Sequence, residues 1–390
     1  MRVLFVARSG NRRGDNQVLL TFLRWLHDDE IEPVVVVGGE GPLVADFERV
    51  AETHVLPPTP HAVSASSSVR RVYNRVTGAR SEIARRRLRR QLDDFDLVYV
   101  NGLGGAAPVV NRLGITDEAP ILTHLHEQAL VLRMFEREAG EASRFIRRTD
   151  HFIAVSPTGA AALRDEYDVA ESSISIVFPF IDLVALAALP NSVGLRALAG
   201  IADDAFIVGG AGHGEWRKGA DLFVQVASEV ARRHGTGNVA FVWLGNVSGT
   251  QRDRLEHDIA GLGVDNVHFV GEHPNAPALF REFDVFCVPS HEDPFACAVL
   301  ECAAAGVPVV RFRAADGREV FGSNGGAIVV DYLDVPAMGQ AITDLVADPA
   351  RRRALGEQAK ECAQDFDVRA AGPRVVEVIK QTARSRARAG

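Results

Sequence analysis

Cysteine is scarce in this sequence, and its spacing excludes the sites that cysteine most often builds. The chain of 390 residues has only four, Cys287, Cys297, Cys302 and Cys362. They form neither the paired spacing of a zinc site nor the dense pattern of a disulfide scaffold. We therefore expect no structural metal, and a reducing cytoplasm is the simplest compartment for these thiols.

Long apolar runs and an excess of positive charge are missing as well. No segment approaches the roughly 20 apolar residues that a membrane-spanning helix needs. The short apolar start, 1–7, predicts a buried strand rather than a signal peptide. The net charge of −8 argues against a nucleic-acid-binding protein, which is normally basic. These absences predict a cytoplasmic protein with no nucleic-acid partner and at most a peripheral contact with membrane.

One basic stretch stands out against the acidic balance. Nine arginines lie between Arg70 and Arg90, interleaved with apolar residues at helical spacing. A basic amphipathic helix can make a peripheral membrane contact on anionic lipid, or hold an anionic acceptor. The alternative is a solvated helix whose charge is balanced by Asp93, Asp94 and Asp96.

The glycine fingerprint of dinucleotide-binding proteins is also absent after the first apolar strand. The loop Arg8–Gly14 has glycine only at its third and last positions, which is not the Gly-x-Gly-x-x-Gly spacing. With 47% hydrophobic residues, the chain can nevertheless form two α/β domains of roughly 180 to 200 residues each.

Short β-branched runs alternate with helical patterns along the whole chain. In the first half the predicted strands are 3–6, 33–37, 97–100, 120–123, 151–155 and 175–177, and the helices are 17–27, 81–92, 127–145 and 158–167. In the second half the predicted strands are 206–209, 239–244, 267–270, 285–288, 307–312 and 327–330, and the helices are 219–233, 251–262, 276–282, 294–305, 335–347 and 351–365. This alternation predicts an α/β fold with two Rossmann-like, doubly wound parallel sheets.

The predicted domains are residues 1–185, residues 186–366 and a basic C-terminal segment, 367–390. A break at Pro190, in an Ala- and Leu-rich stretch, suggests the linker. Two such halves would face each other across a central cleft, the usual place for a ligand in folds of this kind.

The most informative segment is Ser290–Val310. Asp293 is expected to cap a helix that starts at Pro294 and stops at Gly306. The amides of residues 295–297 would then lie at the positive end of the helix, where they can bind anionic or hydroxylated ligand atoms.

Two acids of this segment are spaced for a ligand. Asp293 and Glu301 are eight positions apart, so one helix would carry their carboxylates roughly 12 Å apart on nearly one face. That distance matches a nucleotide sugar from its sugar ring to its ribose. The alternative is that Asp293 only caps the helix and Glu301 is a solvated surface acid.

A glycine-rich loop, 209–219, follows an earlier strand of the second half and ends in Arg217, Lys218 and Gly219. Two cations at the mouth of such a loop could clamp a diphosphate, and Gly219 would let the backbone approach it. The alternative is a solvated cationic pair at the start of a helix.

Polar residues also follow strands of the first half. His126 lies after the strand 120–123 and Asn101 after 97–100, while Gly14 lies at the start of a helix, where its amide could meet a donor phosphate or the acceptor. A packed histidine, a turn asparagine and a tight-turn glycine are the alternatives. His124, His126 and Glu127 lack further ligands at a recognisable spacing, so we expect no metal here.

These motifs resemble those of the GT-B retaining glycosyltransferases of family 4, also called glycosyltransferase group 1. That family carries a D/E-x7-E signature, usually beginning Glu-Pro-Phe-Gly, where this chain has Asp293-Pro294-Phe295-Ala296. The aspartate keeps the charge on a shorter arm, and Ala296 narrows the approach of a sugar. Both departures concern the preferred sugar more than the class.

Two further motifs are similar to the family's. Arg217-Lys218-Gly219 resembles its Arg…Lys-Gly motif, although the arginine of some members falls on Gly212 here. The Gly-Gly pair that many members carry in their first loop aligns with Arg13-Gly14.

The resemblance implies a retaining, metal-independent glycosyltransferase with no cofactor. It would move a sugar from a nucleotide-sugar donor to an acceptor hydroxyl of a natural product, polysaccharide or lipid-linked glycan. The implied donor-binding residues are Gly14, Arg217, Lys218, Asp293, Phe295, Ala296, Cys297 and Glu301. The implied acceptor-side residues are Asn101 and Arg13, and the implied catalytic group is His126, Asp293, Arg217 and Lys218.

Within that group the resemblance implies separate roles. Glu301 would bind the ribose, Arg217 and Lys218 the diphosphate, and Asp293 the sugar, which His126 would orient. Two other functions stay open, namely a nucleotide-sugar epimerase of the same fold and a non-catalytic sugar-nucleotide-binding protein. The presence of both the cationic pair and Glu301 argues against a site that has lost its activity.

Overall fold

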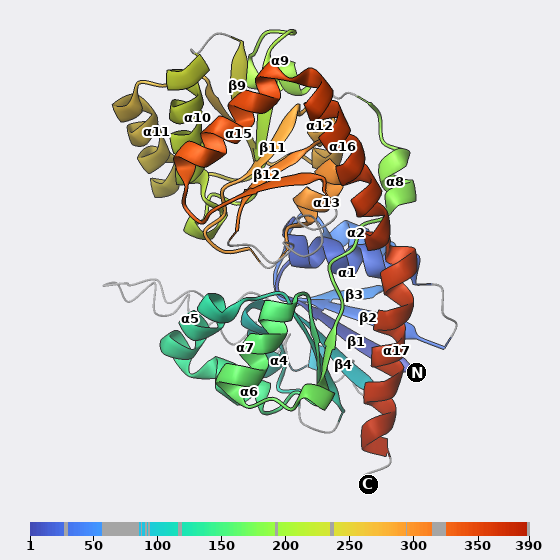
Figure 1. Ribbon diagram of the computed structural model, residues 1–390. Coiled ribbons are helices and arrows are strands. Elements are labelled where there is room, and N and C mark those ends of the chain that lie inside the picture. The colour runs from blue at the N-terminus through green and yellow to red at the C-terminus, as the bar shows by residue number, and fades with distance from the viewer. Residues whose placement is uncertain are drawn as a thin grey trace, which may run out of the picture. The chain divides into compact units, whose positions relative to one another are not determined.

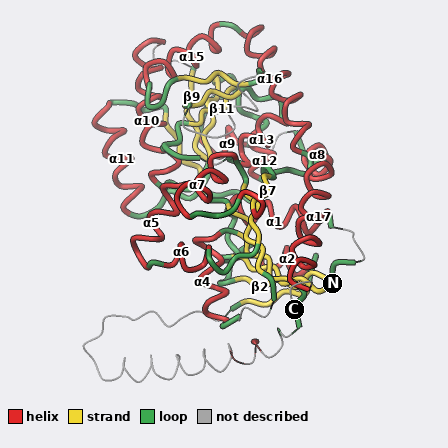
Figure 2. The backbone as a smooth tube through the Cα atoms, turned by 60° about the horizontal axis from the view of Figure 1, so that its bottom comes forward, coloured by secondary structure: helices red, strands yellow, loops and turns green. Residues whose placement is uncertain are grey.

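The computed structural model describes residues 1–26, 30–56, 86, 88–89, 92, 94–115, 119–191, 194–234, 238–293, 295–313 and 325–387. The chain forms two compact units, one of Met1–Phe178 with Ala371–Gly390 and one of Pro179–Ala370. Figure 1 draws both, and Figure 2 shows strands of each enclosed by helices. Except for Arg86, Leu88 and Arg89, the basic stretch Arg70–Arg90 lies outside the described residues, as does Pro294.

The N-terminal unit is built on a seven-stranded sheet in the order β3-β2-β1-β4-β5-β6-β7, with every neighbouring pair parallel. Its strands are β1 (Arg2–Ala7), β2 (Glu32–Val37), β3 (Glu52–Val55), β4 (Leu97–Asn101), β5 (Ile121–Leu125), β6 (His151–Ala154) and β7 (Ile174–Ile176). The strand order reverses between β1 and β4, so the loops after these two strands diverge at a place where such sheets bind ligands.

Both faces of this sheet are buried, because its strands are apolar at successive positions rather than at alternate ones. Leu4 and Val6 of β1 belong to the core cluster that includes α4. Phe5, between them, points to the other face, where its ring contacts those of Phe22 and Tyr99. The helices are α1 (Gly14–Trp25), α2 (Val44–Glu48), α4 (Leu103–Leu113), α5 (Ala129–Ala139), α6 (Glu141–Ile146) and α7 (Pro157–Tyr167).

The C-terminal unit has a six-stranded parallel sheet in the order β10-β9-β8-β11-β12-β13. Its strands are β8 (Phe206–Ala211), β9 (Val239–Leu244), β10 (Val267–Gly271), β11 (Val285–Val288), β12 (Val309–Phe312) and β13 (Ala327–Val330). Here the order reverses between β8 and β11. The loops that leave the carboxyl ends of these adjacent strands are therefore neighbours, although about 75 residues separate them in the sequence.

Helices cover both faces of this second sheet (Figure 1). They are α8 (Leu183–Ala187), α9 (Leu195–Ala199), α10 (Ala220–His234), α11 (Thr250–Leu262), α12 (Ala276–Phe280), α13 (Cys297–Ala304), α15 (Val335–Ala347) and α16 (Pro349–Ala363). On one side α10 packs against α11 and α15, and on the other α13 packs against α12 and α16. The last helix, α17 (Val368–Ala387), belongs to the N-terminal unit from Ala371 onward, where Gly372 lies against the ring of Trp25.

The prediction of two Rossmann-like parallel sheets is confirmed. Strand β3 was not predicted, because it is an edge strand whose residues are polar or only partly buried. Helix α4 was not predicted either, because Gly104, Gly105 and Pro108 are typical of loops rather than helices. The helix predicted over 127–145 is two helices, since Gly140 takes a left-handed conformation between them.

Candidate active site

A buried ion pair joins the two loops at the reversal point of the C-terminal sheet. Lys218 Nζ, in the loop after β8, donates to Asp293 Oδ2, in the loop after β11, at 2.7 Å. The side chains are 16% and 3% exposed, so both charges have left bulk water. Removing a partner from such a pair leaves the other charge without compensation, which is costly.

Burial and the neighbouring charges act in opposite directions on the pKa of each member of the pair. Burial lowers the pKa of Lys218 below its usual range, although the charge of Asp293 opposes the shift. Burial pushes the pKa of Asp293 upward, but the charges of Lys218, Arg217 and Arg311 outweigh it and hold the pKa below its usual value. Asp293 is therefore a carboxylate surrounded by cations, poised to accept hydrogen bonds from hydroxyl groups.

The prediction that Asp293 caps a helix is wrong. Helix α13 begins at Cys297, and its N-cap residue is Ala296, which has no side-chain cap. Asp293 lies three residues before that N-cap and bonds to Lys218 and to the hydroxyl of Ser290 instead. The helical estimate of the distance between Asp293 and Glu301 therefore does not apply, because only Glu301 belongs to the helix.

Arg217 lies beside this pair and also joins the two loops. Its Nη1 donates to the carbonyl oxygen of Glu292 at 3.3 Å, and its own carbonyl accepts from the Glu292 amide at 3.3 Å. Gly219, which follows the cations with φ of 72°, was expected to admit a phosphate. A Cβ there would stand 2.0 Å from the carbonyl oxygen of Pro289, so glycine is required by the chain's own packing.

Arg311 is a functional candidate that the sequence analysis missed. It lies in β12, is 3% exposed, and pairs in register with Val288 at the end of β11. Its charge contributes to lowering the pKa of Asp293. The signal was a charged residue inside an otherwise apolar strand, since arginine is almost never fully buried unless paired.

Glu301 lies in the second turn of α13, half-buried. Burial raises the pKa of its carboxyl to about 7. Within the described ranges no hydrogen bond or ion pair involves this carboxylate, which therefore keeps its acceptor capacity for a ligand. A half-buried acid with a raised pKa is typical of functional sites, although structural acids show such shifts too.

The remaining donor-side residues are at the start of α13. The ring of Phe295 is 7% exposed and stacks on that of Phe366 at 5.2 Å, so only its backbone remains for a ligand. Ala296 is the N-cap, and Cys297 is the first residue of the helix. Cys297 is half-buried, whereas the other three cysteines are buried, and none of the four forms a disulfide.

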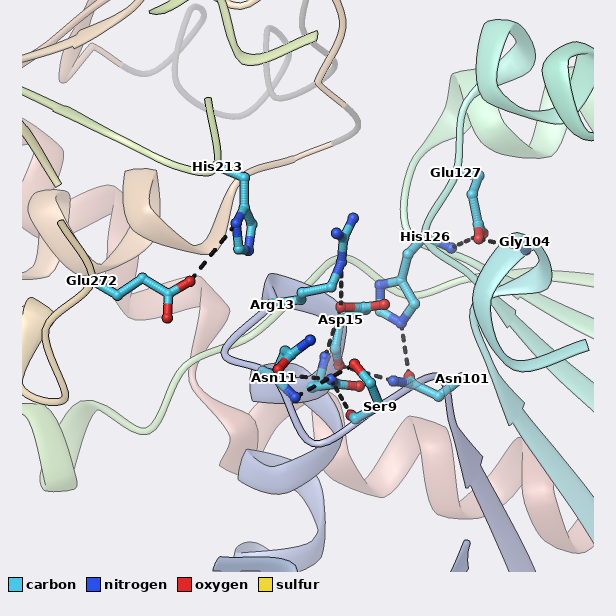
Figure 3. Close-up of polar contacts among 11 residues, drawn as sticks. Ser9, Asn11, Arg13, Asp15, Asn101, Gly104, His126, Glu127, His213 and Glu272 are labelled. Carbon is cyan, nitrogen blue, oxygen red and sulfur yellow. Dashed lines mark hydrogen bonds and ion pairs between the residues drawn. The ribbon is translucent and has the colours of Figure 1, made fainter. Parts of the chain in front are cut away.

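In the N-terminal unit, the predicted residues Asn101 and His126 lie together at the reversal point of the sheet (Figure 3). Asn101 ends β4, and its Nδ2 donates to the carbonyl oxygen of Asp15 in the first turn of α1 at 3.1 Å. This leaves Asn101 Oδ1 to accept from His126 Nε2, just after β5, at 3.0 Å. His126 is thus held with Nε2 protonated and Nδ1 available as an acceptor.

Arg13 and Gly14 reach the same place from the loop after β1. Gly14 is the first residue of α1, and Arg13 is its N-cap residue, with Nε 3.9 Å from Asp15 Oδ1. Figure 3 shows Arg13, Asp15 and His126 side by side. The structure brings Arg13, Gly14, Asn101 and His126 together in the N-terminal unit and the other predicted residues together in the C-terminal unit.

Glu127 is a second residue that the sequence analysis did not assign. Its carboxylate accepts from the amides of Leu103 and Gly104 at 3.1 and 2.8 Å and so caps α4. It also accepts from the amide of His126 at 3.1 Å, which ties the end of β5 to this helix. Burial raises the pKa of Glu127, but these amide hydrogen bonds oppose the shift.

His126 should stay neutral at physiological pH. Burial lowers its pKa to about 4, although the charge of Asp15 opposes the shift. We expect long-range ¹H–¹⁵N NMR of the ring to show one protonated nitrogen, Nε2, from pH 8 down to pH 5, with the signal assigned by its loss in His126→Gln. A titration midpoint near the ordinary value of 6.5 would contradict the expectation.

Neither a cluster of metal ligands nor a membrane-spanning helix occurs among the described residues. No group of three or more histidine, cysteine, aspartate or glutamate side chains in the described part of the chain could hold a metal ion. None of the helices in the described ranges combines the length and apolar character that crossing a membrane requires.

Two parallel sheets, each wound by helices on both faces and each with polar side chains at its reversal point, define a two-domain α/β protein of the GT-B class. Residues 195–362 match the family described as Glycosyl transferases group 1, and residues 13–184 match Glycosyltransferase Family 4. The D-inositol 3-phosphate glycosyltransferase of Arthrobacter sp. (strain FB24) is 30% identical over 309 residues, which cover 73% of this chain and 70% of that protein.

Other relatives agree. The alpha-galactosylglucosyldiacylglycerol synthase of Streptococcus pneumoniae is 27% identical over 57% of this chain and 58% of its own. Among solved structures, Anabaena HepE in complex with UDP and glucose superposes with a TM-score of 0.76 at 19% identity, covering 97% of this chain and 99% of that one. The sucrose-phosphate synthase of Thermosynechococcus elongatus gives 0.73 at 18% identity over 97% and 98%.

The chain therefore belongs to the family 4 glycosyltransferases, the glycosyl transferases group 1, and is an enzyme that transfers glycosyl groups. The GT-B fold is confirmed, as are the family resemblance and the prediction of a glycosyltransferase. The epimerase and the non-catalytic binding protein are not favoured.

Proposed function

We propose that this enzyme transfers a sugar, with retention of configuration and without a metal ion, from a nucleoside diphosphate sugar to an acceptor hydroxyl. The observation that carries the proposal is the buried Lys218–Asp293 pair beside Arg217, with Glu301 in the adjacent helix of the same unit. Fixed cations can stabilise the negative charge that develops on a departing diphosphate, which is the largest need of this reaction.

The chemistry of each donor-side residue supports a separate role in binding the nucleotide sugar. Arg217 and Lys218 would bind the diphosphate, and the Asp293 carboxylate would accept from sugar hydroxyls. Glu301 would accept from the ribose hydroxyls, because its carboxylate has capacity to spare. Several solved structures of this fold contain UDP or UDP-glucose, so uridine nucleotides are the first donors to test.

Asp293 is poorly suited to attack the sugar as a nucleophile. One of its oxygens bonds to Lys218 at 2.7 Å and to Ser290 at 3.3 Å, which reduces its electron density. We therefore favour attack by the acceptor on the face that the diphosphate leaves. The acceptor oxygen bonds to the anomeric carbon, the bond from that carbon to the phosphate oxygen breaks, and the acceptor proton passes to the departing phosphate.

The acceptor side would be the cluster of Asn101, His126 and Arg13 in the N-terminal unit. The neutral His126 can accept a hydrogen bond from a sugar hydroxyl through Nδ1 and so orient it. An arginine beside it suits an anionic acceptor. Because several relatives bear the name D-inositol 3-phosphate glycosyltransferase, that compound is the first acceptor to test. Membrane contact through Arg70–Arg90 stays a prediction.

The reaction can be tested by measuring the binding of UDP, GDP and ADP, and then incubating the matching glucose donors with D-inositol 3-phosphate and EDTA. We expect one nucleotide to bind and the product to be an α-glycoside by NMR, as in the donor. An inverted product, or transfer that stops with EDTA and resumes with Mg²⁺, would overturn retention or metal independence respectively. Epimerised donor without transfer would overturn the function itself.

Cys297 reports where the donor binds. Iodoacetamide should label it first, because it is half-buried and the other three cysteines are buried. We expect the bound nucleoside diphosphate to slow labelling of Cys297 at least about fivefold, since the ligand would cover the start of α13. The readout is the mass of the peptide, with Cys297→Ser as the blank. Labelling at an unchanged rate under saturating nucleotide would contradict this placement.

A further inference from the structure

The two loops that carry the ion pair meet along three consecutive residues, in register. Trp216 faces His291, Arg217 faces Glu292, and Lys218 faces Asp293. The first contact is a ring stack with centroids 4.2 Å apart and planes tilted by 16°. The third is the buried ion pair, and the middle one consists of the two hydrogen bonds between Arg217 and Glu292.

The ring stack of Trp216 on His291 is the first of these three contacts and the only one without an ion pair or hydrogen bond. The indole of Trp216 is 57% exposed, whereas the His291 side chain is 9% exposed and its Nε2 lies 3.5 Å from Asp221 Oδ2 at the start of α10. One partner of the stack is therefore held inside the fold, and the other is a large ring laid against it. An indole left so exposed contributes little to the hydrophobic core, and its flat contact with His291 joins the two loops.

The segment that carries the cations is one short turn, closed by hydrogen bonds from Lys218 N to the carbonyl oxygen of Glu215 at 2.9 Å and from Gly219 N to that of Trp216 at 3.0 Å. Trp216–Lys218 form a single 3₁₀ turn, η2, which ends at Gly219 in the left-handed conformation. Short 3₁₀ turns have poor hydrogen-bond geometry, and the two Arg217–Glu292 hydrogen bonds are long at 3.3 Å. Of the side-chain contacts between the turn and the facing loop, the stack at one end and the ion pair at the other are the strong ones.

We propose that Trp216 and His291 are positioning residues for the donor: their stack sets the register in which Arg217 and Lys218 meet the diphosphate. The proposal rests on the proposed function, because it assigns the diphosphate to these cations. Neither ring needs to touch the donor. The stack acts through the turn, holding the Lys218 ammonium and the Arg217 guanidinium where the terminal phosphate leaves.

The test measures calorimetric affinity for the nucleoside diphosphate that binds among UDP, GDP and ADP, and for its monophosphate. Trp216→Ala and His291→Ala should each weaken diphosphate binding about tenfold, the size of a lost aromatic pair. They should weaken monophosphate binding less than about twofold, because the terminal phosphate needs the cations in register. Trp216→Phe and His291→Phe keep a stack and should restore diphosphate binding to within about threefold of the unmodified enzyme.

Tyr332→Ala is the matched control, since it removes another exposed aromatic ring of the same unit, 48% exposed and outside both loops. It should leave both affinities unchanged. Equal losses for the diphosphate and the monophosphate, or no rescue by phenylalanine, would overturn the positioning role, as would unchanged diphosphate binding in Trp216→Ala. No diphosphate binding by the unmodified enzyme would overturn both this proposal and the proposed function.

Discussion

The Lys218→Met variant should lose sugar transfer, with kcat/KM roughly 10³-fold below that of the unmodified enzyme. Lys218 is the cation nearest Asp293, and its ammonium is almost buried. Methionine is unbranched and only one atom shorter than lysine, but it supplies no charge to the departing diphosphate. The measurement is the initial rate with a nucleotide sugar and its acceptor.

Stability should fall with activity in the same variant. Without Lys218, the buried carboxylate of Asp293 loses the cation that bonds to it at 2.7 Å, although the charges of Arg217 and Arg311 still lower its pKa. Breaking one side of a buried pair typically costs about 3 kcal/mol of unfolding free energy. Lys360→Met, at an exposed position on α16 of the same unit, is the control and should change neither quantity.

Because a destabilised variant can lose activity by unfolding, Lys218→Arg separates the two effects. It keeps a charge, so it should recover most of the stability, but its larger planar head cannot reproduce a point charge in the same place. We expect a folded protein with a rate at least about tenfold below normal. Lys218→Met transferring sugar at the normal rate while folded would show that Lys218 does not act on the donor, and a normal rate for Lys218→Arg would show that the charge alone suffices.

The Glu301→Gln variant should be more stable than the unmodified enzyme and yet bind nucleotide more weakly. The folded-state pKa of Glu301 is raised from 4.5 to about 7, so its protonated form is favoured by folding. The stabilisation of the folded state by protonated Glu301 is fully present below pH 4.5 and is lost as pH rises through 7. At pH 8 the ionised acid therefore costs on the order of 2 kcal/mol of unfolding free energy, after allowance for its partial exposure.

Denaturant unfolding at two pH values checks this expectation. The stability gain of Glu301→Gln over the unmodified enzyme should be small at pH 5 and reach its full size at pH 8. Glu357→Gln, at an exposed position of α16, is the control and should show no such trend. An equal gain at both pH values would mean that the carboxyl of Glu301 is not desolvated.

The nucleotide affinity of the unmodified enzyme should rise with pH, whereas the contribution of Glu301 to its stability falls. The ionised carboxylate accepts ribose hydroxyls best, so binding by the unmodified enzyme should weaken up to about tenfold between pH 8 and pH 6. The phosphates of the nucleotide titrate in this range too, but they are common to both proteins. The ratio of the nucleotide affinity of the unmodified enzyme to that of Glu301→Gln therefore isolates the effect of the Glu301 carboxyl. A ratio independent of pH would remove Glu301 from the ribose site.

Much of the fold could be predicted because its signals are local. Apolar runs of four to six residues, separated by helical stretches, predicted six of the seven strands of one sheet and all six of the other. Strand β3 escaped because an edge strand with polar residues lacks that pattern. Helix α4 escaped because its stability comes from packing on β1, β4 and β5 and from the Glu127 cap, not from its own propensity.

The position of Asp293 shows where local reasoning fails. Asp followed by Pro is a good helix start, and the sequence analysis placed one there. The helix begins three residues after Pro294 because Asp293 is held by Lys218, a partner 75 residues away. Asp293 makes the ion pair at 2.7 Å in place of a helix cap, which is worth about 1 kcal/mol.

By itself, the sequence determined the class of this enzyme, because motifs of a few residues and the alternation of strand and helix are local properties of the chain. It also singled out Lys218, Asp293 and Glu301 as candidates. Only the tertiary structure decided which residues meet. Strands β8 and β11 are neighbours, so their loops pair residue by residue, place the ion pair beside a ring stack and leave the Glu301 carboxylate its capacity for a ligand.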